Sequence, residues 1–158
     1  MSEDPHIQSH IHTMPTSARD LAGLFFGKIL GWGMSRTVYA HYQDKTLVIK
    51  YEYGSQRWQN ILEWEVWETV KDTKYAKWFA PCVDISANGH FLIQKRAEPI
   101  PKGMYPKEIP ALFTDLKFDN FGMIGKQFVC FDYGTCHIPA INKLLKMKKM
   151  KKADWWEA

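Results

Sequence analysis

The alternation of apolar and polar residues in the first half of the chain predicts a short helix followed by three strands. A helix that begins at a possible capping residue, Ser17, leads into apolar residues that end near Gly31. Two further runs, 37–42 and 46–53, are rich in β-branched and aromatic residues, and the turn residues 43–45 separate them. This composition between turn residues is typical of β-strands.

The stretch 55–72 follows a different period, because its apolar residues recur at helical spacing. We therefore predict an amphipathic helix there. Glu63 precedes Val66 by three positions, so it shares the apolar face and is directed at the sheet. The two rival acids lie elsewhere, since Glu65 points away from that face and Glu68 lies further along the helix.

The second half of the chain contains two predicted hairpins and an irregular connector. Residues 82–97 form the first hairpin, with a turn at 87–89, and residues 121–132 form the second, with a turn at 125–126. Four prolines mark the connector between them: Pro99, Pro101, Pro106 and Pro110. Residues 139–156 are predicted to be helical. This order of elements indicates an α+β fold.

Size and composition are those of one compact domain with two small lobes. At 158 residues, with 46% apolar and 15% aromatic content, the chain has enough apolar side chains for a core and is not a disordered protein. We divide it into a flexible N-terminal arm (1–17), a sheet-and-helix lobe (18–98), a smaller lobe (99–142) and a basic C-terminal helix or tail (143–158).

The net charge of +4 arises at the C-terminus, where Lys143 to Lys152 includes six lysines and no acid. Such a run is either a solvated, partly frayed helix, which we favour, or a binding site for nucleic acid, anionic lipid or an acidic protein. Near the other end, His6, His10 and His12 either hold a metal ion or belong to the arm. We favour the arm because their spacing constrains geometry little.

Cysteine usage and the lack of a targeting pattern predict a cytoplasmic protein. The three cysteines form no Cys-x-x-Cys pair, and the polar N-terminus does not resemble a signal peptide. No apolar run approaches the roughly 18–20 residues needed to span a bilayer.

Glycines and a lysine in the first lobe are candidates for phosphate binding. Gly31 and Gly33 lie at a strand end, where backbone amides without neighbouring side chains can approach phosphates. Lys50 ends an apolar strand, so its ammonium either reaches solvent or meets an anion, and Glu63 is placed to meet it.

The stretch 113–134 holds a second group of candidates. A carboxylate, a cation and an amide follow one another on a loop at Asp115, Lys117 and Asn120, and Asp132 ends an apolar strand. A carboxylate in that position is costly unless it binds a metal or accepts hydrogen bonds. Asn120 and Asp132 offer the hard oxygen ligands that suit Mg²⁺ bound to phosphates.

Taken in order, these motifs resemble those of the protein kinase family. They are GWGMSRTV for the glycine-rich loop, LVIK for the strand-three lysine, NILEWEVW for the αC helix, DLKFDN for the catalytic loop and DYG for the metal-binding loop. The resemblance covers about residues 28–134. It implies a kinase-like N-lobe, with an antiparallel sheet and an αC-type helix, followed by a strongly reduced C-lobe that has a catalytic-loop hairpin and a C-terminal helix.

The resemblance also implies an ATP site in the first lobe. Gly31 and Gly33 would cover the phosphates, and Lys50, held by Glu63, would contact them. The residues implied to surround the adenine are Val38, Val48, the gatekeeper Gln94 and the backbone from Lys95 to Ala97.

For the second lobe, the resemblance implies the catalytic groups and the metal ligands. Asp115 would orient the attacking hydroxyl and accept its proton, and Lys117 would neutralise the transferred phosphoryl group. Asn120 and Asp132 would hold Mg²⁺. Catalysis would then consist mainly of positioning and charge neutralisation.

The chain also departs from the family pattern. Arg36 stands where the third glycine of the loop would be, and Phe113 and Thr114 replace the usual His-Arg. Only seventeen residues run from Pro99 to Asp115, which leaves no room for the helices of an ordinary C-lobe. In this respect the chain is similar to compact kinase-like proteins encoded by some bacteriophages, which would place it in the host cytoplasm.

Three functions are consistent with these residues. The first is an ATP- and Mg²⁺-dependent kinase that acts on Ser or Thr of a protein. The second is a weak or inactive pseudokinase that binds nucleotide or a partner protein, such as a host factor. The third, a small-molecule kinase, is less favoured because a lysine two residues after the aspartate is typical of the protein-directed branch. A nucleic-acid partner for the basic tail is not favoured.

Overall fold

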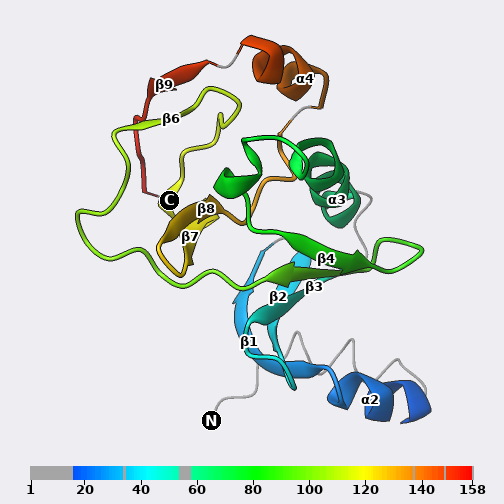
Figure 1. Ribbon diagram of the computed structural model, residues 1–158. Helices are drawn as coiled ribbons and strands as arrows, with labels where there is room; N and C mark the ends of the chain where they lie inside the picture. The colour runs from blue at the N-terminus through cyan, green and yellow to red at the C-terminus, as the bar shows by residue number, and fades with distance from the viewer. Residues whose placement is uncertain (1–15, 34, 54–57, 137, 148, 158) are drawn as a thin grey trace.

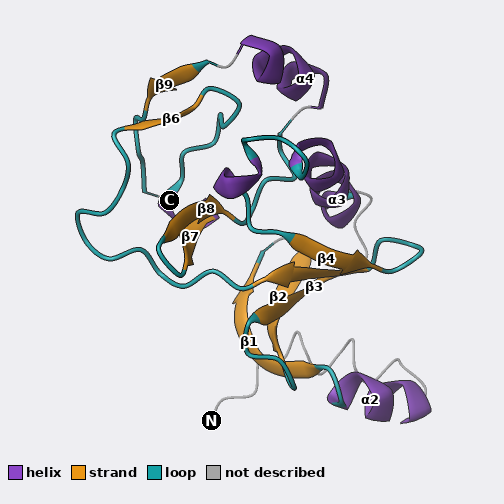
Figure 2. Ribbon diagram, viewed as in Figure 1, coloured by secondary structure: helices purple, strands orange, loops and turns teal. Residues whose placement is uncertain are grey.

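The computed structural model describes residues 16–33, 35–53, 58–136, 138–147 and 149–157, so most of the predicted arm, with its three histidines, lies outside the described residues. The fold is α+β, as predicted (Figures 1 and 2). Its α-helices are α2 (Thr16–Gly23), α3 (Gln59–Val70) and α4 (Ile138–Met147), and its 3₁₀ turns are η1 (Ala76–Trp78) and η2 (Phe118–Asn120). Its strands are β1 (Phe26–Trp32), β2 (Arg36–His41), β3 (Leu47–Glu52), β4 (Cys82–Ile85), β5 (Phe91–Lys95), β6 (Glu108–Pro110), β7 (Phe121–Ile124), β8 (Gln127–Cys130) and β9 (Met150–Lys152).

The main sheet consists of five antiparallel strands in the order β1-β2-β3-β5-β4. The three strands predicted before residue 54 and the hairpin predicted over 82–97 are therefore confirmed. Val38 pairs with Lys50 across β2 and β3, and Val48 pairs with Gln94 across β3 and β5. Since cross-strand partners and residues two apart on a strand share a face, these four side chains lie on the same face of the sheet.

Helix α3 begins against the end of strand β3. Its N-terminus has no side-chain cap of its own. Instead the carboxylate of Glu52 accepts hydrogen bonds from the backbone N–H groups of Gln59 and Asn60, both at 3.0 Å. A carboxylate at this position satisfies two unpaired donors and interacts favourably with the helix dipole. The helix is thereby fixed to the sheet with its buried residues inward: Asn60, Glu63, Val66 and Val70.

The turn between β4 and β5 packs on the same helix. Gly89, at the predicted turn, has φ of +75°, which residues with a side chain rarely adopt. A Cβ atom there would also lie 2.5 Å from Cγ1 of Ile61. Glycine is therefore required both by the backbone conformation of the turn and by its contact with α3.

The β7–β8 hairpin lies beside the segment that leaves the main sheet after β5 (Figure 1). Glu98, just after β5, exchanges two backbone hydrogen bonds of 2.8 Å with Met123 on β7. Around the hairpin, aromatic rings form the centre of the core, with Phe121 stacked on Phe128 at 5.3 Å and both rings in contact with Trp155. The hairpin is thus held by backbone bonds to Glu98 and by packing on Trp155, and this fixes the polar segments that precede β7 and follow β8.

The C-terminal segment differs from its prediction. The helix predicted over 139–156 ends at Met147, and Met150–Lys152 forms β9, which pairs with β6. Trp155 then packs on the aromatic core and donates from Nε1 to the carbonyl of Pro106 at 2.9 Å. Burial of this indole and backbone pairing with β6 override the helical preference of the lysine-rich run. The prediction of a helix over residues 139–156 is therefore wrong after Met147.

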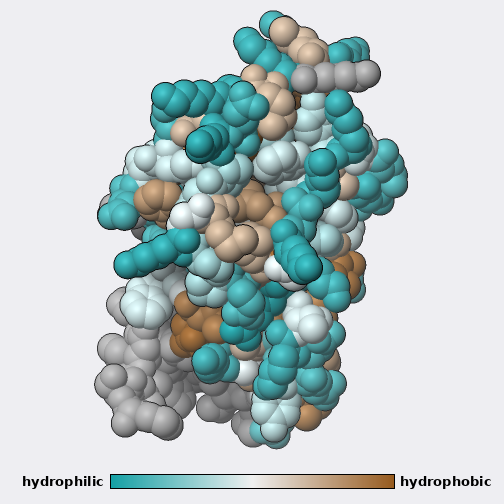
Figure 3. Space-filling view, turned by 60° about the vertical axis from the view of Figure 1, so that its left-hand side comes forward, coloured by the Kyte–Doolittle hydropathy of each residue, from teal (hydrophilic) through white to brown (hydrophobic). Residues whose placement is uncertain are grey.

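The surface mixes hydrophilic residues with scattered apolar ones. Figure 3 shows apolar residues gathered near the middle of one face, with hydrophilic residues around them. Several large apolar side chains are more than half exposed: Leu21, Trp32, Tyr42, Trp58, Met104 and Met147. Isolated exposed apolar residues are common on soluble domains. No helix within the described residues is long and apolar enough to cross a membrane.

Candidate functional site

Lys50 and Glu63, which sequence analysis paired, form a buried ion pair. The Nζ atom of Lys50 lies 2.7 Å from Oε2 of Glu63, and their side chains are 2% and 0% exposed. The same ammonium donates to the backbone carbonyl of Phe131. Strand β3, helix α3 and the segment after β8 therefore meet at one lysine.

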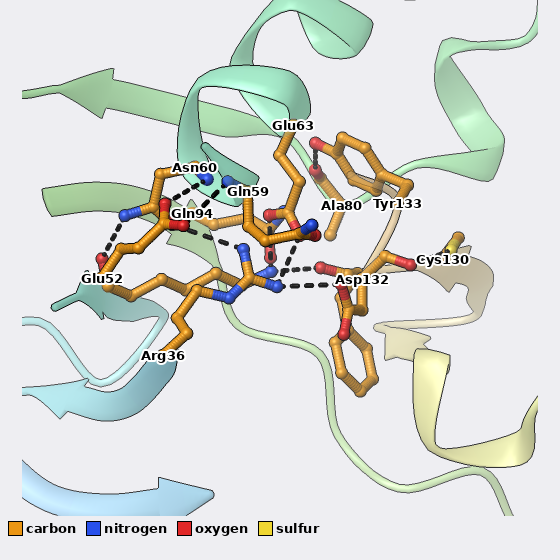
Figure 4. A network of polar contacts seen from close by, with 12 residues as sticks. Arg36, Glu52, Gln59, Asn60, Glu63, Ala80, Gln94, Cys130, Asp132 and Tyr133 are labelled. Atoms are coloured by element: carbon orange, nitrogen blue, oxygen red, sulfur yellow. Dashed lines mark hydrogen bonds and ion pairs between the residues drawn. The ribbon is translucent and has the colours of Figure 1, made fainter. Parts of the chain in front are cut away.

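Arg36 joins this pair to Asp132 (Figure 4). Its Nη2 atom lies 2.8 Å from Oε1 of Glu63 and 2.8 Å from Oδ1 of Asp132. Its Nη1 atom donates to Oδ1 of Asn60 at 3.3 Å. One guanidinium thus holds helix α3 against the loop that follows β8, because its several N–H donors can serve partners on both segments.

Burial and charge act in opposite directions on these groups. Burial acts to lower the pKa of the Arg36 guanidinium, but the carboxylates of Glu63 and Asp132 outweigh this effect, and the pKa is raised. Burial raises the pKa of Glu63, although Arg36 and Lys50 act to lower it. Burial also acts to raise the pKa of Asp132, but Lys50 and Arg36 prevail and lower it. Asp132 therefore stays ionised at neutral pH, as a metal ligand must.

Backbone hydrogen bonds bring Asn120 and Asp132 together. The carbonyl of Asn120 accepts from the N–H of Phe131 at 2.9 Å and from that of Asp132 at 3.4 Å. Close packing fixes the next turn, because a Cβ on Gly134 would lie 2.8 Å from Oε1 of Gln59 at the start of α3. The two proposed metal ligands are therefore neighbours, although twelve positions separate them in the sequence.

A pocket of about 260 Å³ lies where these segments meet. Its lining residues are Gly33, Ser35, Arg36, Gln59, Asp115, Asn120, Asp132 and Thr135. Three of the predicted polar residues, Asp115, Asn120 and Asp132, thus face one cavity. Lys50 is not among the lining residues, since its ammonium is engaged by Glu63 and Phe131.

Asp115 and Lys117 behave differently. The Oδ1 atom of Asp115 is buried and has no hydrogen-bond partner among the described residues, while Asn120 donates from Nδ2 to the Asp115 carbonyl at 3.4 Å. A buried acceptor without a donor is costly, so Oδ1 carries an uncompensated desolvation cost, while Asp115 as a residue lines the pocket. Lys117 does not line the pocket, and its Nζ lies 3.9 Å from Oδ2 of Asp119, whose side chain is 78% exposed.

The residues predicted to surround an adenine lie on or next to the sheet. Val48 and Gln94 are buried, and Oε1 of Gln94 has no hydrogen-bond partner among the described residues. Lys95 ends β5, and Ala97 follows close to Gly122 of β7. Gly31 pairs with Val38 inside the sheet and, unlike Gly33, does not line the pocket.

The residue that sequence analysis missed is Arg36. It was noted only as a departure from the glycine-rich loop, whereas it makes the contacts that join Glu63 to Asp132. Its position in the sequence could have revealed it, because a long cationic side chain replaces a glycine that the kinase resemblance places over the phosphates. Its partner Asn60, which is fully buried, was likewise hidden within the helical pattern.

The donors present suit a metal ion that arrives with phosphates. Within the described part of the chain, no group of three or more His, Cys, Asp or Glu side chains could hold a metal ion by itself. Mg²⁺ is commonly held by one or two carboxylates together with substrate phosphates and water. Asp132 and the amide oxygen of Asn120 could supply the few protein ligands that such an ion needs, with phosphates and water as the others.

The comparisons with known proteins give a partial likeness to a solved structure. The sequence matches no known protein-family model and no curated protein. Among solved structures, it is similar to that of the streptomycin–ATP–APH(2″)-IIa ternary complex, with 17% identity and a TM-score of 0.38. That likeness covers 63% of this chain and 31% of the other. It is too slight to support a function, so the site geometry has to carry the argument.

Proposed function

We propose that this chain binds ATP with Mg²⁺ in the pocket between the main sheet and the β7–β8 hairpin, and transfers the terminal phosphoryl group to a serine or threonine of a protein. The observation that carries the proposal is the convergence of Asp115, Asn120 and Asp132 on one cavity. The ion pair of Lys50 and Glu63 lies one side chain away, linked to the cavity through Arg36. Carboxylates, an amide and a nearby cation around one cavity are the groups that phosphoryl transfer uses.

In the proposed reaction, each residue has a separate part. Asp115, which lines the pocket, would orient the acceptor hydroxyl and accept its proton as the new O–P bond forms. The bond from phosphorus to the ADP oxygen breaks, and ADP leaves with that electron pair. Asn120 and Asp132 would hold Mg²⁺, which neutralises phosphate charge when bound. Lys117 would have to leave Asp119 to reach the phosphoryl group.

A second function is a nucleotide-binding module without transfer. The observation that favours it is the ion pair between Arg36 and Asp132, which engages Oδ1, one of the two carboxylate oxygens that Asp132 offers to a metal. If this contact persists when nucleotide is bound, the site would hold ATP without orienting it for transfer. The chain would then act through its surface, as a pseudokinase that engages a partner protein.

Two measurements on the same preparations distinguish these functions. A thermal-shift titration with ATP and Mg²⁺ tests binding, and saturation at a hundred times the dissociation constant should raise the unfolding free energy by about 2.7 kcal/mol. Transfer from labelled ATP, to the protein itself and to a mixture of Ser/Thr peptides, tests catalysis. Asp115→Asn should abolish transfer and retain binding. The control is Glu65→Gln, which changes an exposed carboxylate on α3 outside the pocket and should leave both intact.

Each outcome has a definite meaning. Transfer that Asp115→Asn abolishes supports the kinase. Binding without transfer in the wild-type protein supports the nucleotide-binding module. No effect of ATP and Mg²⁺ on stability would contradict both functions.

A further inference from the structure

The cation that faces the pocket is not the one that the kinase resemblance implies. Lys50 is 2% exposed, and its ammonium is bound by Glu63 and by the carbonyl of Phe131. Of the residues that line the pocket in the described part of the chain, Arg36 alone carries a positive charge. A phosphate group that enters the cavity therefore meets the guanidinium of Arg36 first.

The guanidinium also has unused capacity. Arginine presents five N–H donors, and Arg36 uses three of them, in contacts with Asn60, Glu63 and Asp132. Its partner Glu63 is completely buried, whereas the side chain of its other partner, Asp132, is 43% exposed. Of these two contacts, the one with Asp132 is thus weakened more by solvent, and an incoming anion can replace it at the lower cost.

The charges around the pocket explain why such a cation is needed. Asp115 and Asp132 both line the cavity, and without Arg36 its wall would carry only negative charge. Two carboxylates that line a partly buried cavity repel a negatively charged polyphosphate. Displacing Lys50 instead would break an ion pair in which both side chains are almost completely buried, and this is far more costly than exchanging a half-exposed one.

We propose that Arg36 binds the phosphates of the nucleotide, and that in their absence it is the counter-ion of Asp132. When phosphates enter, Arg36 keeps its bond to Glu63 and exchanges Asp132 for phosphate oxygens. Asp132 is thereby released for the metal, and Lys50 serves to hold Glu63 in place. This inference rests on the proposed function, since it assigns the phosphate contact within the same site.

The test uses the full chain and inorganic tripolyphosphate in the presence of EDTA, so that neither adenine nor metal contributes. Isothermal titration calorimetry gives the dissociation constant for the wild-type protein and for Arg36→Gln. Loss of a charge-assisted contact should weaken binding by at least about tenfold. The control is Lys71→Gln, which removes one positive charge at an exposed ion pair and should leave the constant unchanged.

A double variant separates a direct contact from a charge effect. If Arg36 only masks Asp132, then Arg36→Gln combined with Asp132→Asn should recover the wild-type affinity, and this would overturn the inference. If Arg36 contacts the phosphates, the double variant should stay at least about tenfold weaker. Should Arg36→Gln fail to fold, the double variant replaces it in the comparison, because it removes Arg36 and Asp132 together and leaves Glu63 its ion pair with Lys50.

The inference and the proposed function can fail separately. Suppose that wild-type protein binds ATP with Mg²⁺. If tripolyphosphate then binds wild-type protein and Arg36→Gln equally well, or binds neither, only the assignment of Arg36 is overturned. If wild-type protein binds neither ATP with Mg²⁺ nor tripolyphosphate, the proposed function falls, and the inference with it.

Discussion

Oε2 of Glu63 lies 2.7 Å from Nζ of Lys50, and both side chains are almost completely buried. The other carboxylate oxygen, Oε1, lies 2.8 Å from Nη2 of Arg36. One carboxylate on helix α3 therefore balances a cation on each of two neighbouring strands. Removing it would leave two buried cations with one partner fewer, which the interior tolerates poorly.

We expect Glu63→Ala to lower the free energy of unfolding by about 3–5 kcal/mol, the range for breaking a buried ion pair by removing one partner. Urea unfolding followed by tryptophan fluorescence measures the change. Glu65→Ala is the matched control, because Glu65 is exposed on the same helix, and it should change stability by less than about 0.5 kcal/mol. Equal effects of the two substitutions would show that the Glu63 ion pairs contribute no stability.

The adjacent tryptophans near the C-terminus should differ in their contribution to stability. Trp155 packs on Tyr105, Phe121 and Phe128, whereas Trp156 is 47% exposed. Trp155→Ala should cost about 2–4 kcal/mol, somewhat below the range for a fully buried tryptophan. Trp156→Ala should cost under about 1 kcal/mol. Thermal unfolding of both variants tests this, and an equal loss would contradict the packing of β9 and its C-terminal extension on the core.

The three cysteines should be unreactive in the folded protein. Burial raises the pKa of Cys82 to about 11 and that of Cys136 to about 12, and it raises the pKa of Cys130 well above its ordinary value. Since the thiolate is the reactive form, labelling by a disulfide reagent at pH 8 should be at least about 100-fold slower than in urea-unfolded protein. Fast labelling of any one thiol in native protein, located by mass spectrometry, would show that its site is open to solvent.

Asp132 should make stability depend on acid pH. Arg36 and Lys50 outweigh burial and lower its pKa, so its ionised form stabilises the folded state above the ordinary aspartate value, and this contribution is lost as pH falls through the lower folded value. The difference in unfolding free energy between wild-type protein and Asp132→Asn should therefore be constant above about pH 5 and shrink below about pH 4.

Urea titrations at successive pH values measure that difference. Asp119→Asn serves as the control, because Asp119 is 78% exposed and contacts Lys117 only at 3.9 Å. Its difference from wild type should stay near zero throughout. A difference for Asp132→Asn that grew as pH fell would contradict the sign of the pKa shift.

Local pattern was sufficient to predict most of the secondary structure. The strands before residue 54, the α3 helix and both hairpins were predicted because period and turn residues are properties of neighbouring positions. The face of Glu63 also followed from helical spacing, and the Lys50 contact agrees with it. The order of the polar motifs was visible in the sequence for the same reason, since each motif is short and continuous.

Only the tertiary structure decided which cation faces the pocket and how the chain ends. Arg36 and Asp132 are 96 positions apart, and no local rule predicts that a residue expected to be glycine will reach a carboxylate in the segment after β8. Likewise the lysine-rich run has helical propensity throughout, yet only its first half lies in α4, and Met150–Lys152 forms β9 where β6 offers backbone partners and Trp155 packs on the aromatic core. In both places the free energy comes from contacts between distant segments, and these exceed the small local preferences that a sequence pattern expresses.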